Sequence, residues 1–220
     1  MRLFKVFTPL AAVALLCSPP VVHAHGDEDH GSDGVTISST TNSKNALSVV
    51  PSALDSVGGP FSLVDHNGRN VTQDSFNGKH TLVFFGYVDC QIMCSISLNR
   101  IGTALELLQQ EDKNLEDRLV PLVVTVDPES DTPEKMRSAL EKYHPLLLGL
   151  TGDDSELQQI YTAYNQNPAP LDQTINGENV ISHQSYFYLM GPDGSFRTLF
   201  PPILSAESMA AVLRKYISES

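Results

Sequence analysis

Residues 81–94 read TLVFFGYVDCQIMC, and this stretch decides the fold that we expect. Its first half, residues 81–87, is a continuous apolar and aromatic run, which is typical of a fully buried strand. Cys90 and Cys94 follow, and beyond them apolar residues recur at helical spacing. The thiols therefore lie where a buried strand ends and a helix begins, a position at which free N–H groups and the helix dipole stabilise thiolates.

The spacing of the two cysteines indicates chemistry without deciding its kind. If residues 90–94 form a helical turn, both sulfur atoms lie on one face, because positions i and i+4 align. That arrangement suits either a reversible disulfide or a soft metal ion. A disulfide across so short a loop would remove little entropy from the unfolded chain, so a purely structural bridge is the weaker interpretation.

Length and charge limit the class of protein. The chain has 220 residues, which suits one well-buried domain. Its formal net charge is −12, which argues against a nucleic-acid partner, because phosphates must be neutralised by Lys and Arg.

Residues 1–24 are expected to form a signal peptide. Arg2 and Lys5 precede a short apolar run at residues 10–16, and residues 22–24 resemble a small-residue cleavage site. The run is shorter than the ~20 residues that span a bilayer. We therefore expect an exported, periplasmic protein that is soluble after cleavage, with an uncleaved N-terminal membrane anchor as the alternative.

Residues 25–57 are expected to form a flexible acidic and polar arm, because the segment is rich in Gly, Ser and Asp and has no hydrophobic period. His25 and His30 lie among carboxylates there, so the arm is either a weak divalent-metal binder or a solubilising tail. The folded domain is expected to cover residues 58–220.

The remaining elements alternate between strand and helix. Thr132 and Pro133 predict the start of one helix, and we expect Asp131 and Thr132 to act as its caps. This order predicts an α/β protein with a thioredoxin-like fold, in which helices flank a central mixed sheet with an added N-terminal hairpin. The expected elements are a hairpin at 61–72, strands at 118–125 and 146–150, helices at 134–142 and 155–165, a loop at 165–179, strands at 184–190 and 196–200, and a helix at 206–218.

His183 is a candidate third ligand. It lies in the stretch ISHQSYFYLMGPDG, and in a thioredoxin-like sheet this position can face the cysteine turn. A lone histidine is usually structural. Two thiolates and one imidazole nevertheless form a soft set of low coordination number: thiolates favour Cu(I), imidazole suits either copper state, and zinc would need a fourth ligand. Asp127 ends a strand, where functional groups of parallel sheets collect.

Four stretches in this order carry a family resemblance: FFGYVDCQIMC, VDPESDTP, LLGLTGD and SHQSYFYLMGPDG. From about Gly58 to its end, the chain resembles the Sco/SenC family, which is named for the synthesis of cytochrome c oxidase. The resemblance implies a membrane-facing copper chaperone with a thioredoxin fold. It also implies that Cys90, Cys94 and His183 are the copper ligands and that Asp127 is an accessory or partner-contacting residue.

The chain departs from the family pattern at three positions. Family members usually carry proline directly after each cysteine, where this chain has Gln91 and Ser95, and Ser130 replaces the usual arginine. Without proline the backbone of the cysteine loop is freer, which is expected to change copper affinity or redox behaviour.

These observations predict an exported metallochaperone that binds Cu(I) or Cu(II) and assists assembly of a copper centre of cytochrome c oxidase. The alternative is a thiol–disulfide oxidoreductase that uses Cys90 and Cys94 as a redox-active pair, so enzymatic activity is left open. The expected partners are a copper-receiving oxidase subunit or another copper carrier, and a thiol–disulfide partner. Membrane contact is expected only through a partner or an uncleaved N-terminus.

Overall fold

The computed structural model describes residues 56–90, 93–175 and 178–218. The predicted signal peptide and nearly all of the predicted arm therefore lie outside the described residues. Val57, at the end of that arm, is 5% exposed and packs in the core. The elements are β1 Ser62–Asp65, β2 Asn70–Thr72, η1 Gln73–Phe76, β3 His80–Gly86, α1 Met93–Glu111, η2 Leu115–Asp117, β4 Leu119–Thr125, α2 Pro133–Leu140, β5 Leu148–Thr151, α3 Asp154–Ala163, β6 Ala169–Ile175, β7 Glu178–Ser182, β8 Phe187–Met190, β9 Phe196–Phe200 and α4 Ala206–Ser218.

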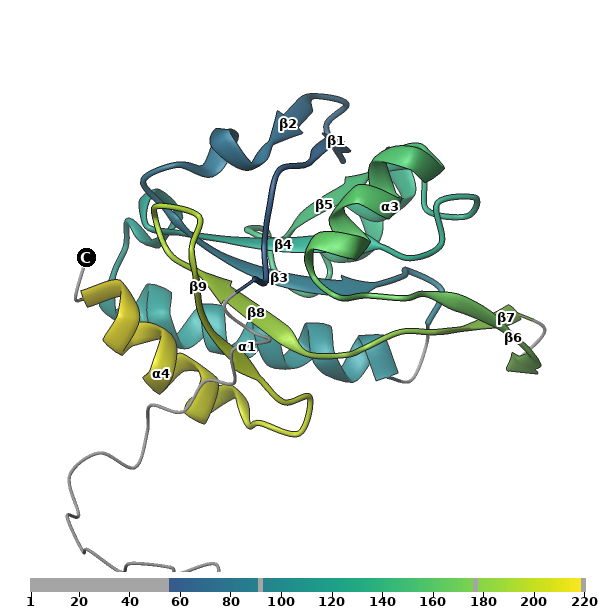
Figure 1. Ribbon diagram of the computed structural model, residues 1–220. Coiled ribbons are helices and arrows are strands. Elements are labelled where there is room, and N and C mark those ends of the chain that lie inside the picture. The colour runs from purple at the N-terminus through teal and green to yellow at the C-terminus, as the bar shows by residue number, and fades with distance from the viewer. Residues whose placement is uncertain (1–55, 91–92, 176–177, 219–220) are drawn as a thin grey trace, which may run out of the picture. The chain divides into compact units, whose positions relative to one another are not determined.

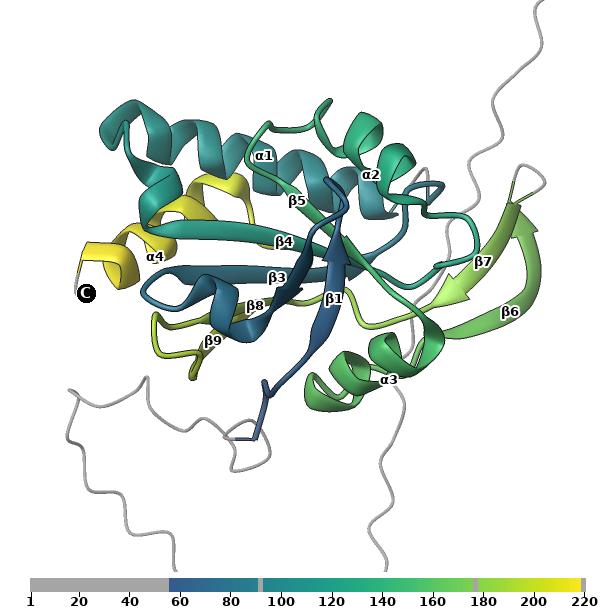
Figure 2. The same cartoon turned by 90° about the horizontal axis from the view of Figure 1, so that it is seen from above.

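Seven strands form the central sheet, in the order β2-β1-β5-β4-β3-β8-β9. The three middle strands β5, β4 and β3 are parallel, and the hairpins β1–β2 and β8–β9 extend the sheet on either side with antiparallel pairs. Helices α1, α2 and α4 cover one face, and α3 covers the other (Figures 1 and 2). The predicted thioredoxin-like fold with an N-terminal hairpin is confirmed.

Strand β3 is buried along its whole length, as its continuous apolar run predicted. Successive side chains point to opposite faces of the sheet. Phe84 therefore packs against Phe187 with ring centroids 5.2 Å apart, while Phe85 faces α3 and contacts Tyr161 and Tyr188. Burial on both sides fixes the strand, and with it the turn that carries the cysteines.

The prediction of a loop at residues 165–179 is wrong. Strands β6 and β7 pair there as a separate antiparallel sheet, which projects from the body of the domain (Figures 1 and 2). Pro168 and Pro170 favour a loop in this part of the sequence, but β6 contains Pro170. In a two-stranded ribbon, proline is tolerated at an edge or an irregularity, and the β6–β7 register shifts between Pro170 and Thr174. His183 thus follows a strand, not a long flexible loop.

Helix starts follow the local sequence. Thr132 caps α2 by accepting a hydrogen bond from the Lys135 amide, and Pro133 occupies the first helical position, as predicted. In the described ranges, no helix has both the length and the apolar character needed to cross a membrane.

Candidate metal centre

The two thiols lie at the junction of β3 and α1, as the sequence predicted. Both cysteines are free; Cys94 is 1% exposed and Cys90 is half-buried. Cys90 precedes α1, and its sulfur accepts a hydrogen bond from the Cys94 amide at 3.3 Å. Cys90 therefore satisfies a free N–H group of the first helical turn, as an N-cap side chain does.

The environment separates the acidities of the two thiols. A hydrogen bond from the Cys94 thiol, with further bonds from the Cys94 amide and Tyr87, lowers the pKa of Cys90 to about 6 against the effect of its burial. The hydrogen bond to Cys90 and burial raise the pKa of Cys94. The two shifts have opposite directions, so Cys90 is the more acidic thiol of the pair and Cys94 is the less acidic one.

His183 lies close to Cys94, although 89 residues separate the two in the sequence. It lies between β7 and β8, and its Nε2 atom is 3.9 Å from the Cys94 sulfur. Its ring stands edge-on to Phe84 and Tyr87, at centroid distances of 6.4 and 6.2 Å. Burial lowers the pKa of His183, so the imidazole is neutral at pH 7 and has a lone pair to offer.

The structure brings the three predicted ligands together in pairs. Cys94 contacts both Cys90 and His183. Nevertheless, across residues 56–90, 93–175 and 178–218, no three side chains of His, Cys, Asp or Glu are close enough to hold a metal ion. A metal bound by all three would therefore require a further approach of these side chains. Of the positions that depart from the family pattern, Ser95 lies in the first turn of α1, and Gln91 is outside the described residues.

Asp127 shares a cavity with residues that precede the cysteines, not with the cysteines themselves. It lines a cavity of about 470 Å³ together with Tyr87, Asp89 and Ile181. Asp89 is paired with Lys135. Among the described residues, the Asp127 carboxylate makes no hydrogen bond to either cysteine or to His183. Its position suits contact with a partner better than a place in the ligand set.

Asp131 has a structural role that the sequence did not reveal. It is fully buried, and it accepts hydrogen bonds from the Val88 amide at 3.1 Å and from the Thr125 hydroxyl at 2.7 Å. Burial raises its pKa to about 6. The carboxyl group thus joins Val88, two residues after β3, to the end of β4 and holds the start of the cysteine turn. Thr132 alone caps the helix, so the capping role predicted for Asp131 is not observed.

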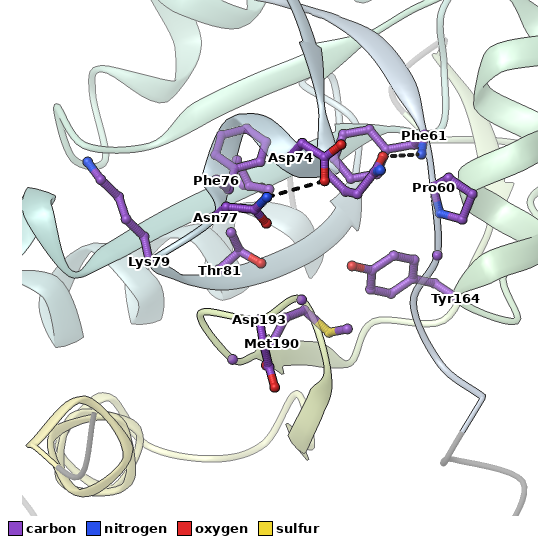
Figure 3. Close-up of a pocket in the computed structure, with 15 residues that line it drawn as sticks. Pro60, Phe61, Asp74, Phe76, Asn77, Lys79, Thr81, Tyr164, Met190 and Asp193 are labelled. Carbon is purple, nitrogen blue, oxygen red and sulfur yellow. Dashed lines mark hydrogen bonds between the residues drawn. The ribbon is translucent and has the colours of Figure 1, made fainter.

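A second cavity lies at the opposite end of β3. It has a volume of about 280 Å³ and is lined by Phe61, Asp74, Thr81, Tyr164 and Met190 among others. The hydroxyl groups of Thr81 and Tyr164 point into it (Figure 3). The lining contains neither cysteine nor histidine, and its only sulfur atom is the thioether of Met190.

Comparisons with known proteins identify the family of the chain. The family model described as SCO1/SenC matches residues 50–218. The chain is 32% identical to Protein sco1 of Schizosaccharomyces pombe, over 73% of this chain and 60% of that protein. It is 30% identical to an SCO2-like protein of Rickettsia prowazekii, over 72% of this chain and 76% of that protein.

Solved structures give the same result. ScoI of Bradyrhizobium japonicum with copper bound is 38% identical with a TM-score of 0.65, covering 73% of this chain and 99% of that one. ScoI of Arabidopsis thaliana with copper bound is 27% identical with a TM-score of 0.68, covering 74% and 99%. The fold, the placement of the cysteines at the end of β3 and the sequence matches lead to one conclusion: the chain belongs to the SCO1/SenC family.

Proposed function

We propose that this protein is a copper-binding metallochaperone that assists assembly of a copper centre of cytochrome c oxidase, with Cys90, Cys94 and His183 as the copper ligands. The observation that carries the proposal is the 3.9 Å approach of His183 Nε2 to the Cys94 sulfur, across 89 residues of sequence, beside the Cys90 thiolate. The copper-bound ScoI structures of two relatives support it.

The donor atoms suit copper. Thiolate sulfur is the preferred ligand of Cu(I), and a neutral imidazole extends the set to Cu(II). Cys90 offers a thiolate at neutral pH, whereas Cys94 must release its proton as the metal binds. A three-ligand site leaves a coordination position open, through which a ligand of the receiving protein enters when copper is transferred.

We further propose that the chain is exported by its N-terminal residues 1–24 and acts in the periplasm. There it would meet a copper-receiving oxidase subunit or another copper carrier. The acidic Asp127 beside the site would contribute to contact with that partner.

The test is metal analysis of protein purified with its thiols reduced. We expect one Cu(I) or one Cu(II) per chain, with sulfur-to-copper charge-transfer absorption in the Cu(II) form. His183→Ala should weaken Cu(II) more than Cu(I), because two thiolates can still hold Cu(I). His66→Ala, at the β1–β2 turn, is the matched histidine control and should bind like wild type. Unchanged bands and affinity in His183→Ala would remove the histidine from the ligand set.

A second function is favoured by one observation, the lowered pKa of the half-exposed Cys90 next to Cys94. Such a thiolate attacks a partner's disulfide, and Cys94 then resolves the mixed disulfide. Two electrons pass to the partner, and this protein is left with a Cys90–Cys94 disulfide. This reductase activity needs no His183, so full activity of His183→Ala together with absence of copper binding by wild type would favour it.

A further inference from the structure

We propose that Gln166 is a positioning residue for the copper ligand His183. The inference rests on the proposed function, because it concerns how that ligand is held. Gln166 lies shortly after the end of α3 and is 4% exposed. Neither the sequence pattern nor the family comparison assigns it a role.

Both ends of the Gln166 side-chain amide are occupied. Its Nε2 donates to the Tyr188 hydroxyl at 3.0 Å, and its Oε1 accepts from the backbone amide of Gln184 at 3.2 Å. The backbone N–H of Gln166 donates to the Tyr161 carbonyl at 2.7 Å, which ties it to the end of α3. A buried amide with both ends bonded has one orientation, because any other would leave polar atoms without partners.

Gln184 passes this constraint to the histidine. The His183 Nδ1 atom lies 3.3 Å from the Gln184 carbonyl oxygen, while Gln184 Nε2 donates to the carbonyl of Asn165 at 3.1 Å. Two consecutive residues after α3 therefore hold the backbone and the side chain of Gln184. Asn165 has φ of 53°, a left-handed conformation that turns the chain out of the helix.

The hydrogen bonds to Asn165 and Gln166 hold Gln184 in a segment that the sheet does not support. Residues 183–186 fall between β7 and β8, so no strand ladder orders them. With Nδ1–H donating to the Gln184 carbonyl, the lone pair is on Nε2, the atom that faces the Cys94 sulfur. Ligand histidines commonly have their second ring nitrogen fixed by such a carbonyl, which sets both tautomer and ring orientation. Gln166 acts one step further out, through the peptide that carries the carbonyl.

The test compares Gln166→Met, which keeps length and removes the amide, with Gln158→Met. Gln158 is exposed on α3 and bonds only within that helix, so it is the matched control. The first measurement is ¹⁵N NMR of the histidine rings in copper-free protein. We expect a single Nδ1–H tautomer of His183 in wild type and Gln158→Met, and a tautomer mixture in Gln166→Met.

The second measurement is copper affinity. We expect Gln166→Met to lower the affinity for Cu(II) about 10-fold or more, since loss of a residue that positions a metal ligand costs about 10–100-fold in metal affinity. Cu(I), held by the two thiolates, should weaken less. Gln166→Glu keeps an acceptor oxygen for the Gln184 amide and should restore the tautomer. A general loss of packing would lower thermal stability without this split between Cu(II) and Cu(I).

If Gln166→Met fails to fold, Tyr188→Phe replaces it, because it keeps the ring and removes the hydroxyl that accepts from Gln166 Nε2. A partial tautomer mixture is then expected. A wild-type tautomer in the folded variant would overturn the proposal, as would unchanged Cu(II) affinity in Gln166→Met. If wild type binds no copper but the tautomer still shifts, the proposed function fails while the positioning role stands.

Discussion

At the C-terminal end of β3 the fold gathers two thiols and an imidazole, whereas at its N-terminal end a cavity collects the hydroxyls of Thr81 and Tyr164 and the carboxylate of Asp74. Both ends belong to one buried strand, and both receive side chains from distant parts of the chain. Sulfur and imidazole are soft or intermediate donors, whereas hydroxyl and carboxylate oxygens are hard ones. The end with the two thiols and the imidazole is therefore the one suited to copper, because the cavity end offers oxygen donors and a single thioether, Met190.

The largest expected effect on copper binding comes from removing one of the two cysteine sulfur atoms. Cys90→Ser and Cys94→Ser should each abolish stoichiometric copper binding, because a single thiolate with imidazole no longer retains Cu(I) against a chelator. Competition with a Cu(I) chelator measures the effect. Tyr164→Phe, at the opposite end of β3, should bind copper like wild type. One tightly held copper in either serine variant would contradict the assignment.

The acidity of Cys90 gives the second prediction. Its pKa of about 6 means that its alkylation rate should rise with pH through about 6 and then level off, whereas an ordinary thiol keeps accelerating to pH 9. Cys94, buried and with a raised pKa, should stay unmodified in the folded protein. Iodoacetamide labelling with peptide mapping distinguishes the two. Tyr87→Phe removes one hydrogen bond to the Cys90 sulfur and should move the midpoint upward.

Much of the fold was predictable because its signals are local. The continuous apolar run of β3, the Thr132–Pro133 helix start and the alternation of strands with helices all lie within short windows of sequence. The β6–β7 ribbon was missed because the described side chains of β6 are almost all exposed, so no burial pattern marks the strand.

Some residues of the site could likewise be predicted from the sequence, and others could not. Cys90 and Cys94 follow from their place after a buried strand, and His183 required the family resemblance as well. The sequence indicated Asp131 only as a helix cap and did not single out Gln166, because each has a remote partner: Val88 is 43 residues from Asp131, and Tyr188 is 22 residues from Gln166. Hydrogen bonds of this kind have no sequence period, and only the folded chain reveals them.

Asp131, which holds the cysteine turn, should make the free energy of unfolding depend on pH. Its pKa is raised from 3.8 to about 6, so the folded state binds its proton more tightly than the unfolded state. This carboxyl should therefore lower the free energy of unfolding as pH rises from well below 4 to well above 6, by about 3 kcal/mol over the whole range at 1.36 kcal/mol per pKa unit.

The buried histidines titrate in the same range with the opposite sign, because their lowered pKa values favour folding at higher pH. The measurement is therefore a difference: urea unfolding of wild type and Asp131→Asn at pH 4 and pH 7. The free energy of unfolding of the variant, minus that of wild type, should be more favourable to the variant at pH 7 than at pH 4. An equal effect at both pH values would show that Asp131 titrates normally.

The smallest predicted effect concerns the cavity end of β3. Tyr164 is 4% exposed, and its ring packs against Phe85 and Tyr188 at 5.4 Å each. In the described part of the chain its hydroxyl makes no hydrogen bond, and it faces the cavity (Figure 3). Tyr164→Phe should therefore change the free energy of unfolding by less than about 0.5 kcal/mol, because it removes no bond and leaves the ring packing intact.

Tyr161, on α3, is the matched control. Its hydroxyl donates to the Thr125 carbonyl at 2.7 Å in a buried position. Tyr161→Phe removes that bond with the same loss of one oxygen atom and should cost about 1–3 kcal/mol, because the carbonyl loses a partner where water does not reach it. Urea unfolding of both variants measures the difference. An equal cost at Tyr164 would contradict this prediction and show that its hydroxyl has a hydrogen-bond partner in the folded protein.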